Sequence, residues 1–418
     1  MKKNITAIVV TWNSLRLIKS LARTIRGIEP LCNIVISDNA SSDSTVDAVR
    51  EMLPRAKIVR NGMNGGFGYA NNRALSICDS EYVLLLNSDA SITRSSLEKL
   101  LSTLENDTGA AGVQPLVRLW GWPLITLSAG AAMTEYGRGY DFDFMHFQPC
   151  PERETTEVPC ITAALSLFRK DALQNVGGFD ENIFMYYEDV DLCLRLRGMG
   201  YSFLLDPESV GKHMMGASSS RRRAEQWELH SSAYITRKFL GGRNCILPDY
   251  WRRTEFRTRI SCMLNGRSWL WRLSALLRVG KMRIEHVSLP PEFLMRLLAP
   301  RPLRMPYPRS NDRPLESFPE SNVMAGPGWQ GMKTGSCGFG CLCVPDKEGI
   351  LTLLIRSCNI PGSVALWSKS GSPSRVFLNA GRKREITAVV AAGVKELYLV
   401  PDRSEQIIEL KNVTYTYR

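Results

Sequence analysis

The sequence predicts an α/β fold with a doubly wound sheet in its N-terminal part, followed by a basic helical segment and a small all-β, sandwich-like domain. Strand and helix patterns alternate over the first ~100 residues, which is the order found in doubly wound sheets. A central stretch is rich in Arg, Trp and Leu, and short β-prone runs separated by turn residues follow residue 321. The 418 residues are enough for two or three domains.

Apolar periodicity assigns the elements of the N-terminal part. The expected strands are Ile5–Thr11, Asn33–Ser37, Lys57–Arg60 and Tyr82–Asn87, and the expected helices are Ser14–Ile25, residues 41–53 and one that follows Asn64–Tyr69. The run Tyr82–Asn87 is continuously apolar, as expected for a parallel strand that is covered on both faces. Residues 110–175 are less regular, and we expect them to form an acceptor-side insert.

The chain is expected to divide into four parts: an α/β domain over 1–220, a basic amphipathic helical region over 221–300, a Pro-rich linker over 301–320 and a β domain over 321–418. The expected strands of the β domain are Gly349–Arg356, Ser363–Ser368, Arg375–Leu378, Glu385–Val390, Glu396–Val400 and Ile407–Tyr417. Their short length and the turn residues between them favour a sandwich.

Composition excludes several classes of protein. Hydrophobic residues make up 44% of the chain and charged residues 22%, as in ordinary globular proteins. The N-terminal apolar run is too short for a signal peptide, and we expect no transmembrane helix. Eleven scattered cysteines indicate reduced thiols rather than a disulfide framework. Cys337, Cys341 and Cys343 have no nearby His, so their spacing does not favour a zinc site.

The net charge of +12 is concentrated in one segment. Between Arg221 and Ser310 there are 19 Lys and Arg against 6 Asp and Glu, a local balance of +13. Basic residues interleaved with Trp and Leu suit an anionic membrane surface, and a solvated helical face fits the same composition equally well. Nucleic-acid binding is not favoured, because no helix-turn-helix, RNP or zinc-finger pattern is present.

Polar motifs follow each of the four expected strands, where a doubly wound sheet binds its ligands. Thr11 ends the first strand, Asp38 follows the second, Asn64–Gly68 follows the third and Asn87-Ser88-Asp89 follows the fourth. Asp38 can accept hydrogen bonds from a base or ribose, and a local turn or helix cap is the alternative. The glycine-rich stretch offers backbone N–H groups to phosphate, and Asn87 and Asp89 offer oxygens to a divalent cation.

The segment Val176–Arg197 holds the densest acidic cluster. Its carboxylates are Asp180, Glu181, Glu188, Asp189 and Asp191. One or two acidic residues are explained by a helix N-terminus, but three within four residues repel one another unless a cation, a proton or a substrate compensates them. We therefore interpret the cluster as functional, and His213, which follows a later strand, as a possible nitrogen ligand.

These motifs together carry a resemblance. The order TWN, SDNASSDS, NGGFGYANN, LLLNSDA, GGFDENIFMYYEDVDLCLRLR and GKH resembles the family 2 glycosyltransferases over residues 4–240, most closely the bacterial rhamnosyltransferase-like branch. The resemblance implies a GT-A fold with a mixed sheet, and inverting, metal-dependent transfer from a nucleotide-diphospho-sugar. It implies that the nucleotide is bound by Thr11, Asp38, Asn64, Gly66, Phe67 and Asn87. It further implies Mg²⁺ or Mn²⁺ on Asp89 and His213, Asp189 as general base, and Glu188 and Asp191 orienting the base or the acceptor.

One departure concerns the metal, since many relatives have Asp-x-Asp where this chain has Asn87-Ser88-Asp89. Asn87 is a neutral and weaker ligand, so metal affinity is expected to be lower, or Asn87 binds ribose instead. A sugar nucleotidyltransferase is an alternative, but TWNSLRL lacks the basic glycine-rich loop that grips a triphosphate. A non-catalytic saccharide- or membrane-binding scaffold is the second alternative, which the intact acidic cluster disfavours.

The resemblance also sets expectations for partners and location. We expect a saccharide acceptor that is lipid-linked, rhamnose as a candidate sugar, and a role in surface polysaccharide synthesis. The protein is expected in the cytoplasm, peripheral on the inner face of the cell membrane, and it is not expected to bind nucleic acid. The β domain lies outside the resemblance, and a contact with a second copy or another protein is its open role.

Overall fold

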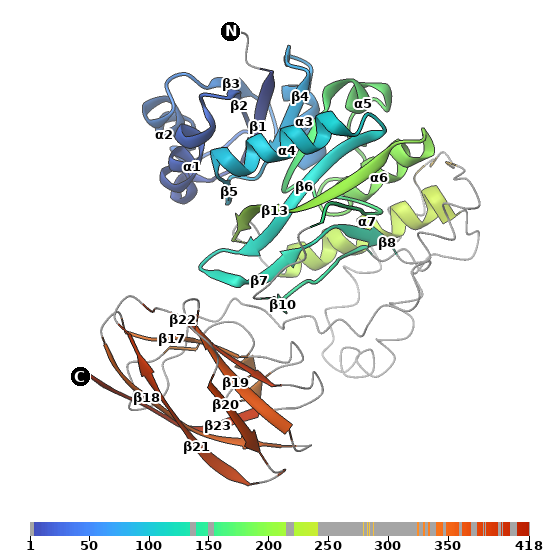
Figure 1. Cartoon of the computed structure of the whole chain (residues 1–418). Coiled ribbons are helices and arrows are strands. Elements are labelled where there is room, and N and C mark those ends of the chain that lie inside the picture. The colour runs from blue at the N-terminus through green and yellow to red at the C-terminus, as the bar shows by residue number, and fades with distance from the viewer. Residues whose placement is uncertain are drawn as a thin grey trace, which may run out of the picture. The chain divides into compact units, whose positions relative to one another are not determined.

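The computed structural model describes residues 4–133, 139–148, 154–214 and 221–240, four single residues between 279 and 287, and most of residues 324–417 (Figure 1). The chain forms two compact units. The first comprises Met1–Trp120, Thr126–Phe144 and Pro151–Arg301, and the second comprises Gly121–Ile125, Met145–Cys150 and Pro302–Arg418. The basic segment beyond residue 240 and the Pro-rich linker lie outside the described residues, apart from four isolated positions, so the predicted domain limits stay predictions.

The first unit is built on a mixed sheet. Four parallel strands, β1 (Ile5–Thr11), β2 (Cys32–Asp38), β3 (Lys57–Arg60) and β4 (Tyr82–Leu86), match the predicted ones. Next to β4 lies β12 (Leu165–Arg169), which is antiparallel to β4 and to β6 (Ala110–Leu119). The long strand β13 (Ser202–His213) runs parallel to β6 and pairs with the short β5 (Ala90–Ile92). The GT-A-like mixed core is thus confirmed.

Helices cover both faces of this sheet (Figure 1). On one face, α1 (Leu15–Ile28) and α4 (Arg94–Asn106) share a buried apolar cluster with the sheet. On the other, α3 (Phe67–Leu75), α5 (Lys170–Asn175) and α6 (Glu188–Gly198) share a second cluster. Leu84 joins the first cluster and Leu85 the second, which is why β4 is apolar at every position. The remaining helices are α2 (Thr45–Met52) and α7 (Arg221–Leu240).

Residues 110–175 are more regular than their sequence suggests, and their role as an acceptor-side insert stays a prediction. They contribute β6 and β12 to the interior of the sheet, and β7 (Trp122–Ser128) and β10 (His146–Phe147) extend the sheet beyond β6, while β11 (Thr156–Glu157) pairs with β13. Strands β8 (Ala131–Met133) and β9 (Gly139–Asp141) form a separate two-stranded sheet. Glycine and proline within β6 conceal its strand pattern. Gly112 is required there because a β-carbon would press against the side chains of Ile161 and Phe168.

The second unit is all-β. Its two five-stranded sheets have the orders β14-β17-β22-β19-β20 and β15-β16-β23-β18-β21, and their apolar side chains form one buried cluster. The six predicted strands are confirmed as β18 (Gly349–Ser357), β19 (Gly362–Ser368), β20 (Ser374–Leu378), β21 (Lys383–Val390), β22 (Glu396–Pro401) and β23 (Ile408–Tyr417). Four short strands precede them: β14 (Met324–Ala325), β15 (Trp329–Gln330), β16 (Lys333–Thr334) and β17 (Gly340–Cys343).

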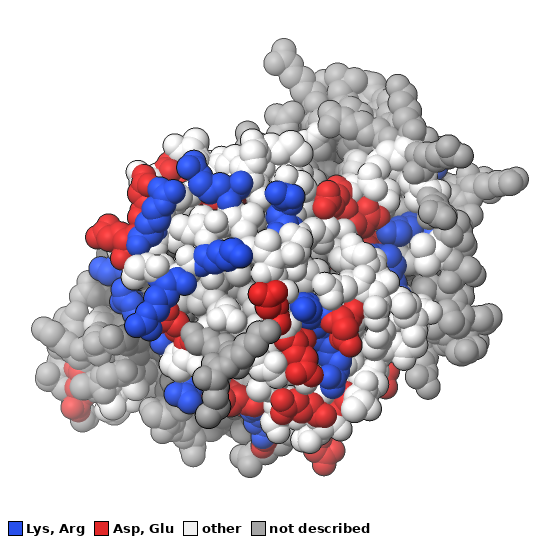
Figure 2. Space-filling view, turned by 90° about the horizontal axis from the view of Figure 1, so that it is seen from above, with Lys and Arg blue, Asp and Glu red and all other residues white. Residues whose placement is uncertain are grey.

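The described surface carries charges of both signs (Figure 2). The face shown in Figure 2 carries described basic and acidic side chains close to one another, which fits the near-neutral balance outside the basic segment. In the described part of the chain, no helix is long and apolar enough to cross a membrane.

Candidate active site

The ends of β1 and β2 hold the first group of predicted residues. Thr11 lies opposite Asp38 in the parallel register, and the Thr11 hydroxyl donates to Asp38 Oδ1 at 2.9 Å. Ser41 donates to the same carboxylate twice, from its hydroxyl at 2.6 Å and from its backbone N–H at 2.9 Å. Asp38 is 2% exposed. The carboxylate is therefore held rigidly by its own turn, and a local turn was the alternative interpretation of Asp38 in the sequence.

Two buried asparagines connect this strand end to the glycine-rich loop. Asn61 Nδ2 donates to Asn39 Oδ1 at 3.0 Å, and Asn39 Nδ2 donates to the carbonyl of Gly66 at 2.9 Å. Gly66 has a φ of 96°, which only glycine adopts readily. A β-carbon on Gly66 would also overlap the carbonyl of Phe184. The loop therefore needs glycine at this position for both reasons.

The glycine-rich loop differs from its prediction in one respect. Asn64 Oδ1 accepts from the N–H of Gly66 at 3.1 Å, and the carbonyl of Phe184 accepts from the N–H of Phe67 at 3.0 Å. These two N–H groups therefore already have partners, contrary to the expectation that they are open to phosphate. Instead, the N–H of Phe67 connects the glycine-rich loop to the acidic motif.

The predicted metal ligands lie together. Antiparallel pairing places His213 on β13 opposite Ala90 on β5, and the N–H of Met214 donates to the carbonyl of Asp89. As a result, His213 Nε2 lies 3.0 Å from Asp89 Oδ1, and Asn87 Nδ2 lies 3.5 Å from the same nitrogen. Carboxylate and amide oxygens are suitable ligands for Mg²⁺ or Mn²⁺ when substrate phosphates and water complete the shell, and an imidazole nitrogen suits Mn²⁺ better than Mg²⁺. No cluster of three or more Asp, Glu, His or Cys that could hold a metal is found among the described residues.

Within the acidic motif, a strained turn directly precedes helix α6. Tyr186 and Tyr187 have φ values of 65° and 68°, in the left-handed region that non-glycine residues rarely adopt. Two such residues in succession must be held in place by their surroundings, and strain of this kind is concentrated at functional sites. Helix α6 starts directly after them with Glu188 and Asp189.

Glu188 and Asp189 form a coupled acidic pair. Burial, and to a lesser extent the neighbouring charge of Asp189, raises the pKa of Glu188 to about 8. Burial also raises the pKa of Asp189, although the N–H groups of Ala163 and Val190 donate to its carboxylate at 3.3 and 2.8 Å and oppose the shift. Glu188 Oε2 is buried without a hydrogen-bond partner. Glu188 is therefore protonated near neutral pH.

A third carboxylate near the pair was missed by the sequence analysis. Burial raises the pKa of Asp141, on β9, to about 7; a hydrogen bond from Ser128 opposes the shift, and the negative charge of Asp189 adds to it. Asp141 lies in a short strand next to a poorly patterned region, so no sequence signal marked it. The charge of Asp189 therefore acts on a further acid that a different strand supplies.

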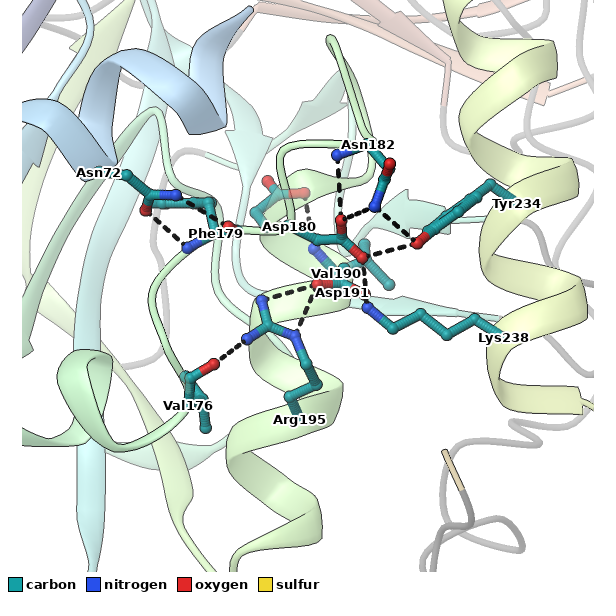
Figure 3. Close-up of polar contacts among 11 residues, drawn as sticks. Asn72, Val176, Phe179, Asp180, Asn182, Val190, Asp191, Arg195, Tyr234 and Lys238 are labelled. Carbon is teal, nitrogen blue, oxygen red and sulfur yellow. Dashed lines mark hydrogen bonds and ion pairs between the residues drawn. The ribbon is translucent and has the colours of Figure 1, made fainter. Parts of the chain in front are cut away.

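Two of the other three acidic residues of the motif, Asp180 and Asp191, have cationic partners (Figure 3). Lys238 of α7 places its Nζ 2.6 Å from Asp180 Oδ2 and 2.6 Å from Asp191 Oδ1. Arg195 lies 2.7 Å from the other oxygen of Asp191, whose side chain is fully buried. Asp191 was expected to orient the base or the acceptor, and this role stays a prediction. Its ion pairs are with Arg195 and Lys238 in the interior.

A short backbone segment connects the metal-ligand pair to the acidic pair. The carbonyl of Ala164 accepts from the N–H of Asn87 at 2.8 Å, and the N–H of Ala163 donates to Asp189 Oδ2 at 3.3 Å. The strand end that carries Asp89 and the helix start that carries Asp189 are thus fixed to adjacent residues of one segment. The predicted site residues therefore occupy one connected hydrogen-bonded region.

Comparison with known proteins identifies the domain. Residues 6–177 match the family model described as Glycosyl transferase family 2. The chain contains a family 2 glycosyltransferase domain. The matched range includes the strand ends with Thr11, Asp38 and Asp89, while the acidic motif and His213 follow it.

Named relatives of this glycosyltransferase include rhamnosyltransferases. The chain is 27% identical over 278 residues to the N-acetylglucosaminyl-diphospho-decaprenol L-rhamnosyltransferase of Mycobacterium tuberculosis, covering 61% of this chain and 88% of the relative. It is 25% identical over 242 residues to the rhamnosyltransferase WbbL of Escherichia coli, covering 54% and 91%. Among solved structures, it is similar to the mannosyltransferase PcManGT of Pyrobaculum calidifontis in complex with GDP-Man and Mn²⁺, with 18% identity, a TM-score of 0.43, and coverage of 66% of this chain and 73% of that one.

The geometry of Gly66 yields a first prediction. Gly66→Ala should lower the free energy of unfolding by about 1–3 kcal/mol, because the left-handed backbone and the Phe184 carbonyl both oppose a β-carbon. Nucleoside diphosphate affinity, measured by calorimetry, should fall with it. Gly62→Ala is the matched control, since a β-carbon there meets nothing within 4 Å. Wild-type stability and affinity in Gly66→Ala would show that the loop does not need this conformation.

Burial of Glu188 yields a second prediction, on stability. Its pKa is about 8 in the folded state and about 4.3 in an unfolded chain, so wild-type stability falls as pH rises between these values. Glu188→Gln stays neutral, and its melting temperature relative to wild type should rise from about pH 4 to about pH 8 and then level off. Glu105→Gln, at an exposed position on α4, serves as the control. A constant difference across this range would contradict the assigned burial of a neutral Glu188.

Proposed function

We propose that the protein is an inverting glycosyltransferase that moves a sugar, with rhamnose as the first candidate, from a nucleotide-diphospho-sugar to a lipid-linked saccharide in surface polysaccharide synthesis. The observation that carries this proposal is the joining of the Asp89–His213 pair and the Glu188–Asp189 pair through residues 163 and 164. The mycobacterial relative supports the choice of sugar and acceptor, since its name specifies rhamnose transfer to a diphospho-decaprenol-linked sugar.

The acidic pair fits the role of a general base. A carboxylate must take the proton of the acceptor hydroxyl as the new glycosidic bond forms, because a neutral hydroxyl is a poor nucleophile. Asp189 is partly exposed and is held by two backbone N–H groups, so its carboxylate is oriented before the acceptor binds. Its raised pKa brings its basicity closer to the pH at which the enzyme works. Attack from the side opposite the leaving diphosphate inverts the anomeric carbon.

The donor side fits a nucleotide-diphospho-sugar. Thr11 and Asp38 form a rigid polar strand end that is suited to the nucleoside, and the loop around Asn64 and Gly66 lies next to it. Asp89 and His213 would hold a divalent cation, with Asn87 as a neutral neighbour. Such a cation, when bound, would offset negative charge on the departing nucleoside diphosphate. Because the protein supplies few ligands, we propose that the diphosphate contributes a large part of its coordination.

The role of Asp189 is tested by substitution. Asp189→Asn should lower kcat by ~10²–10⁴-fold, because the amide cannot accept the proton, while nucleoside diphosphate affinity stays near that of wild type. Transfer from a radiolabelled nucleotide-sugar and calorimetry measure the two quantities. Glu181→Gln, an exposed neighbour on the same motif, is the control. Turnover at the wild-type rate in Asp189→Asn would rule out the assigned base.

The metal proposal has its own test. Wild-type protein should bind a nucleoside diphosphate more tightly with Mn²⁺ or Mg²⁺ than with EDTA, and Asp89→Ala should abolish that difference. His213→Ala should reduce the difference less, because Asp89 supplies the anionic ligand. Calorimetry with and without metal measures both. Equal affinity of wild-type protein with metal and with EDTA would refute metal-dependent donor binding.

We further propose peripheral attachment to an anionic membrane through the basic segment 221–310, most of which lies outside the described residues. Each Lys or Arg near such a surface contributes about 1 kcal/mol, screened beyond a Debye length of ~8–10 Å. Vesicles with anionic lipid should therefore sediment the protein at low salt, and high salt should release it. Equal recovery with neutral vesicles would instead favour a solvated helical face.

A further inference from the structure

One face of α7 packs along residues 180–187, which precede α6 and are called the acidic loop below. The face consists of side chains four, three and four residues apart, which a helix places in one row: Trp227, Ser231, Tyr234 and Lys238. The Trp227 ring lies 4.9 Å from the ring of Phe184. The Ser231 hydroxyl donates to the carbonyl of Met185 at 2.9 Å. This part of the chain was interpreted from sequence as a membrane or solvated face, yet its described part packs on the motif that carries the general base.

Asp180 is the first anchor point of this face (Figure 3). The Tyr234 hydroxyl donates to Asp180 Oδ2 at 2.8 Å, and Asn182 donates to Asp180 Oδ1 through its backbone N–H at 3.0 Å and its amide at 2.9 Å. Burial alone would raise the pKa of Asp180, but the Lys238 ammonium and these hydrogen bonds lower it to about 2. The carboxylate is therefore an anion throughout the physiological pH range, and it depends on Lys238 for compensation.

Lys238 joins two separate parts of the motif. Its ammonium, on a side chain 7% exposed, contacts Asp180 at the start of the loop and Asp191 in the first turn of α6, each at 2.6 Å. Asp180 and Asp191 bracket the residues in between, which include Glu188 and Asp189. A buried charge is stable only when it is paired and hydrogen-bonded, so removing the ammonium leaves two carboxylates without their common partner. The loop and the helix would then lose the contact that fixes one against the other.

The loop between the two anchor points needs external support. Tyr186 and Tyr187 both have left-handed backbones, which persist only where surrounding contacts impose them. On the other side, the carbonyl of Phe184 accepts from the N–H of Phe67 in the glycine-rich donor loop. The loop is thus held between the donor side and α7, and a shift of its position would move Asp189 relative to the bound sugar.

We infer that Lys238 is a positioning residue for glycosyl transfer: its two ion pairs lock the acidic loop and α6 into the geometry in which Asp189 meets the acceptor hydroxyl. This inference rests on the proposed function. In the proposed complex, Lys238 contacts neither the donor nor the acceptor. Its loss should therefore reduce the rate of the chemical step while the donor cluster at Thr11, Asp38 and Asn64 stays intact.

Steady-state kinetics on the full-length protein test the inference. Lys238→Met should lower kcat by ~10²-fold, the effect of a displacement of about 1 Å in a reacting group. The donor KM should stay within about threefold of wild type, since donor contacts do not change. Arg237→Met is the matched control, because it removes a cation from the neighbouring position of α7, where Arg237 bonds to the carbonyl of Val279. Lys238→Arg keeps the charge and should recover most of the lost kcat.

A double-mutant cycle separates positioning from general loosening. Asp180→Asn removes one of the two carboxylates that Lys238 compensates, so Lys238→Met should reduce kcat less in that background than in wild type. Additive losses in the cycle, or an equal rise in donor KM and fall in kcat for Lys238→Met, would overturn the inference. Failure of Lys238→Arg to exceed Lys238→Met in kcat would do the same.

Hydrogen exchange supplies a readout that does not depend on the proposed reaction. Lys238→Met should speed amide exchange in peptides covering residues 180–191, and Arg237→Met should leave it unchanged. Unchanged exchange in Lys238→Met would refute the lock. If wild-type protein transfers no sugar while exchange responds as expected, the proposed function fails and the physical lock is retained.

Discussion

The acidic motif depends on charge compensation inside the protein. Asp180 and Asp191 share the ammonium of Lys238, and Arg195 completes the contacts of Asp191. Among the described residues no cation forms an ion pair with Glu188, and its raised pKa favours the protonated form. The carboxylates of the motif therefore differ in environment rather than in sequence. Asp180 and Asp191 fix the backbone through ion pairs, and Glu188 and Asp189 are the two to which we propose a role in the reaction.

The mixed sheet explains why polar residues that are far apart in the sequence meet. Parallel strands β1, β2 and β4 end on the same edge, which brings Thr11, Asp38 and Asp89 to one rim. The antiparallel pairing of β13 with β5 then brings His213 to Asp89, although 124 residues separate them in sequence. Residues 163 and 164, just before β12, attach this rim to Asp189. Strand order and register, rather than local sequence, thus determine the composition of the site.

Loops around the site are held in uncommon conformations by contacts with one another. Asn39 fixes Gly66 in its left-handed conformation, and Phe67 donates to Phe184 in the acidic loop. Tyr186 and Tyr187 take strained backbones between that contact and α6. Each loop is thus supported by the next, and these contacts hold the strained backbone of Tyr186 and Tyr187 in place.

Elements with a local sequence pattern could be predicted before the fold was known. Continuous apolar strands, the helical face of α1 and the six long strands of the β unit follow from periodicity, because side-chain burial repeats with the backbone geometry. The clustering of Thr11, Asp38 and Asp89 also followed, since parallel strands of a doubly wound sheet end on one edge. Gly and Pro in β6 concealed a central strand, because packing against Ile161 and Phe168 outweighs intrinsic propensity there.

The pairing and the protonation of the carboxylates follow from the folded structure and could not be predicted from the sequence. The five acidic residues of the motif cannot be distinguished in the sequence. Lys238, 47 residues after Asp191, forms ion pairs with Asp180 and Asp191, and these two carboxylates therefore hold the backbone in place. The effect of Asp189 on Asp141 could not be predicted either. It arises because the short strand β9 packs against Tyr187 and Val190 at the start of α6. Burial and charge pairing are long-range properties of the folded chain, and they set the pKa values on which the proposed chemistry depends.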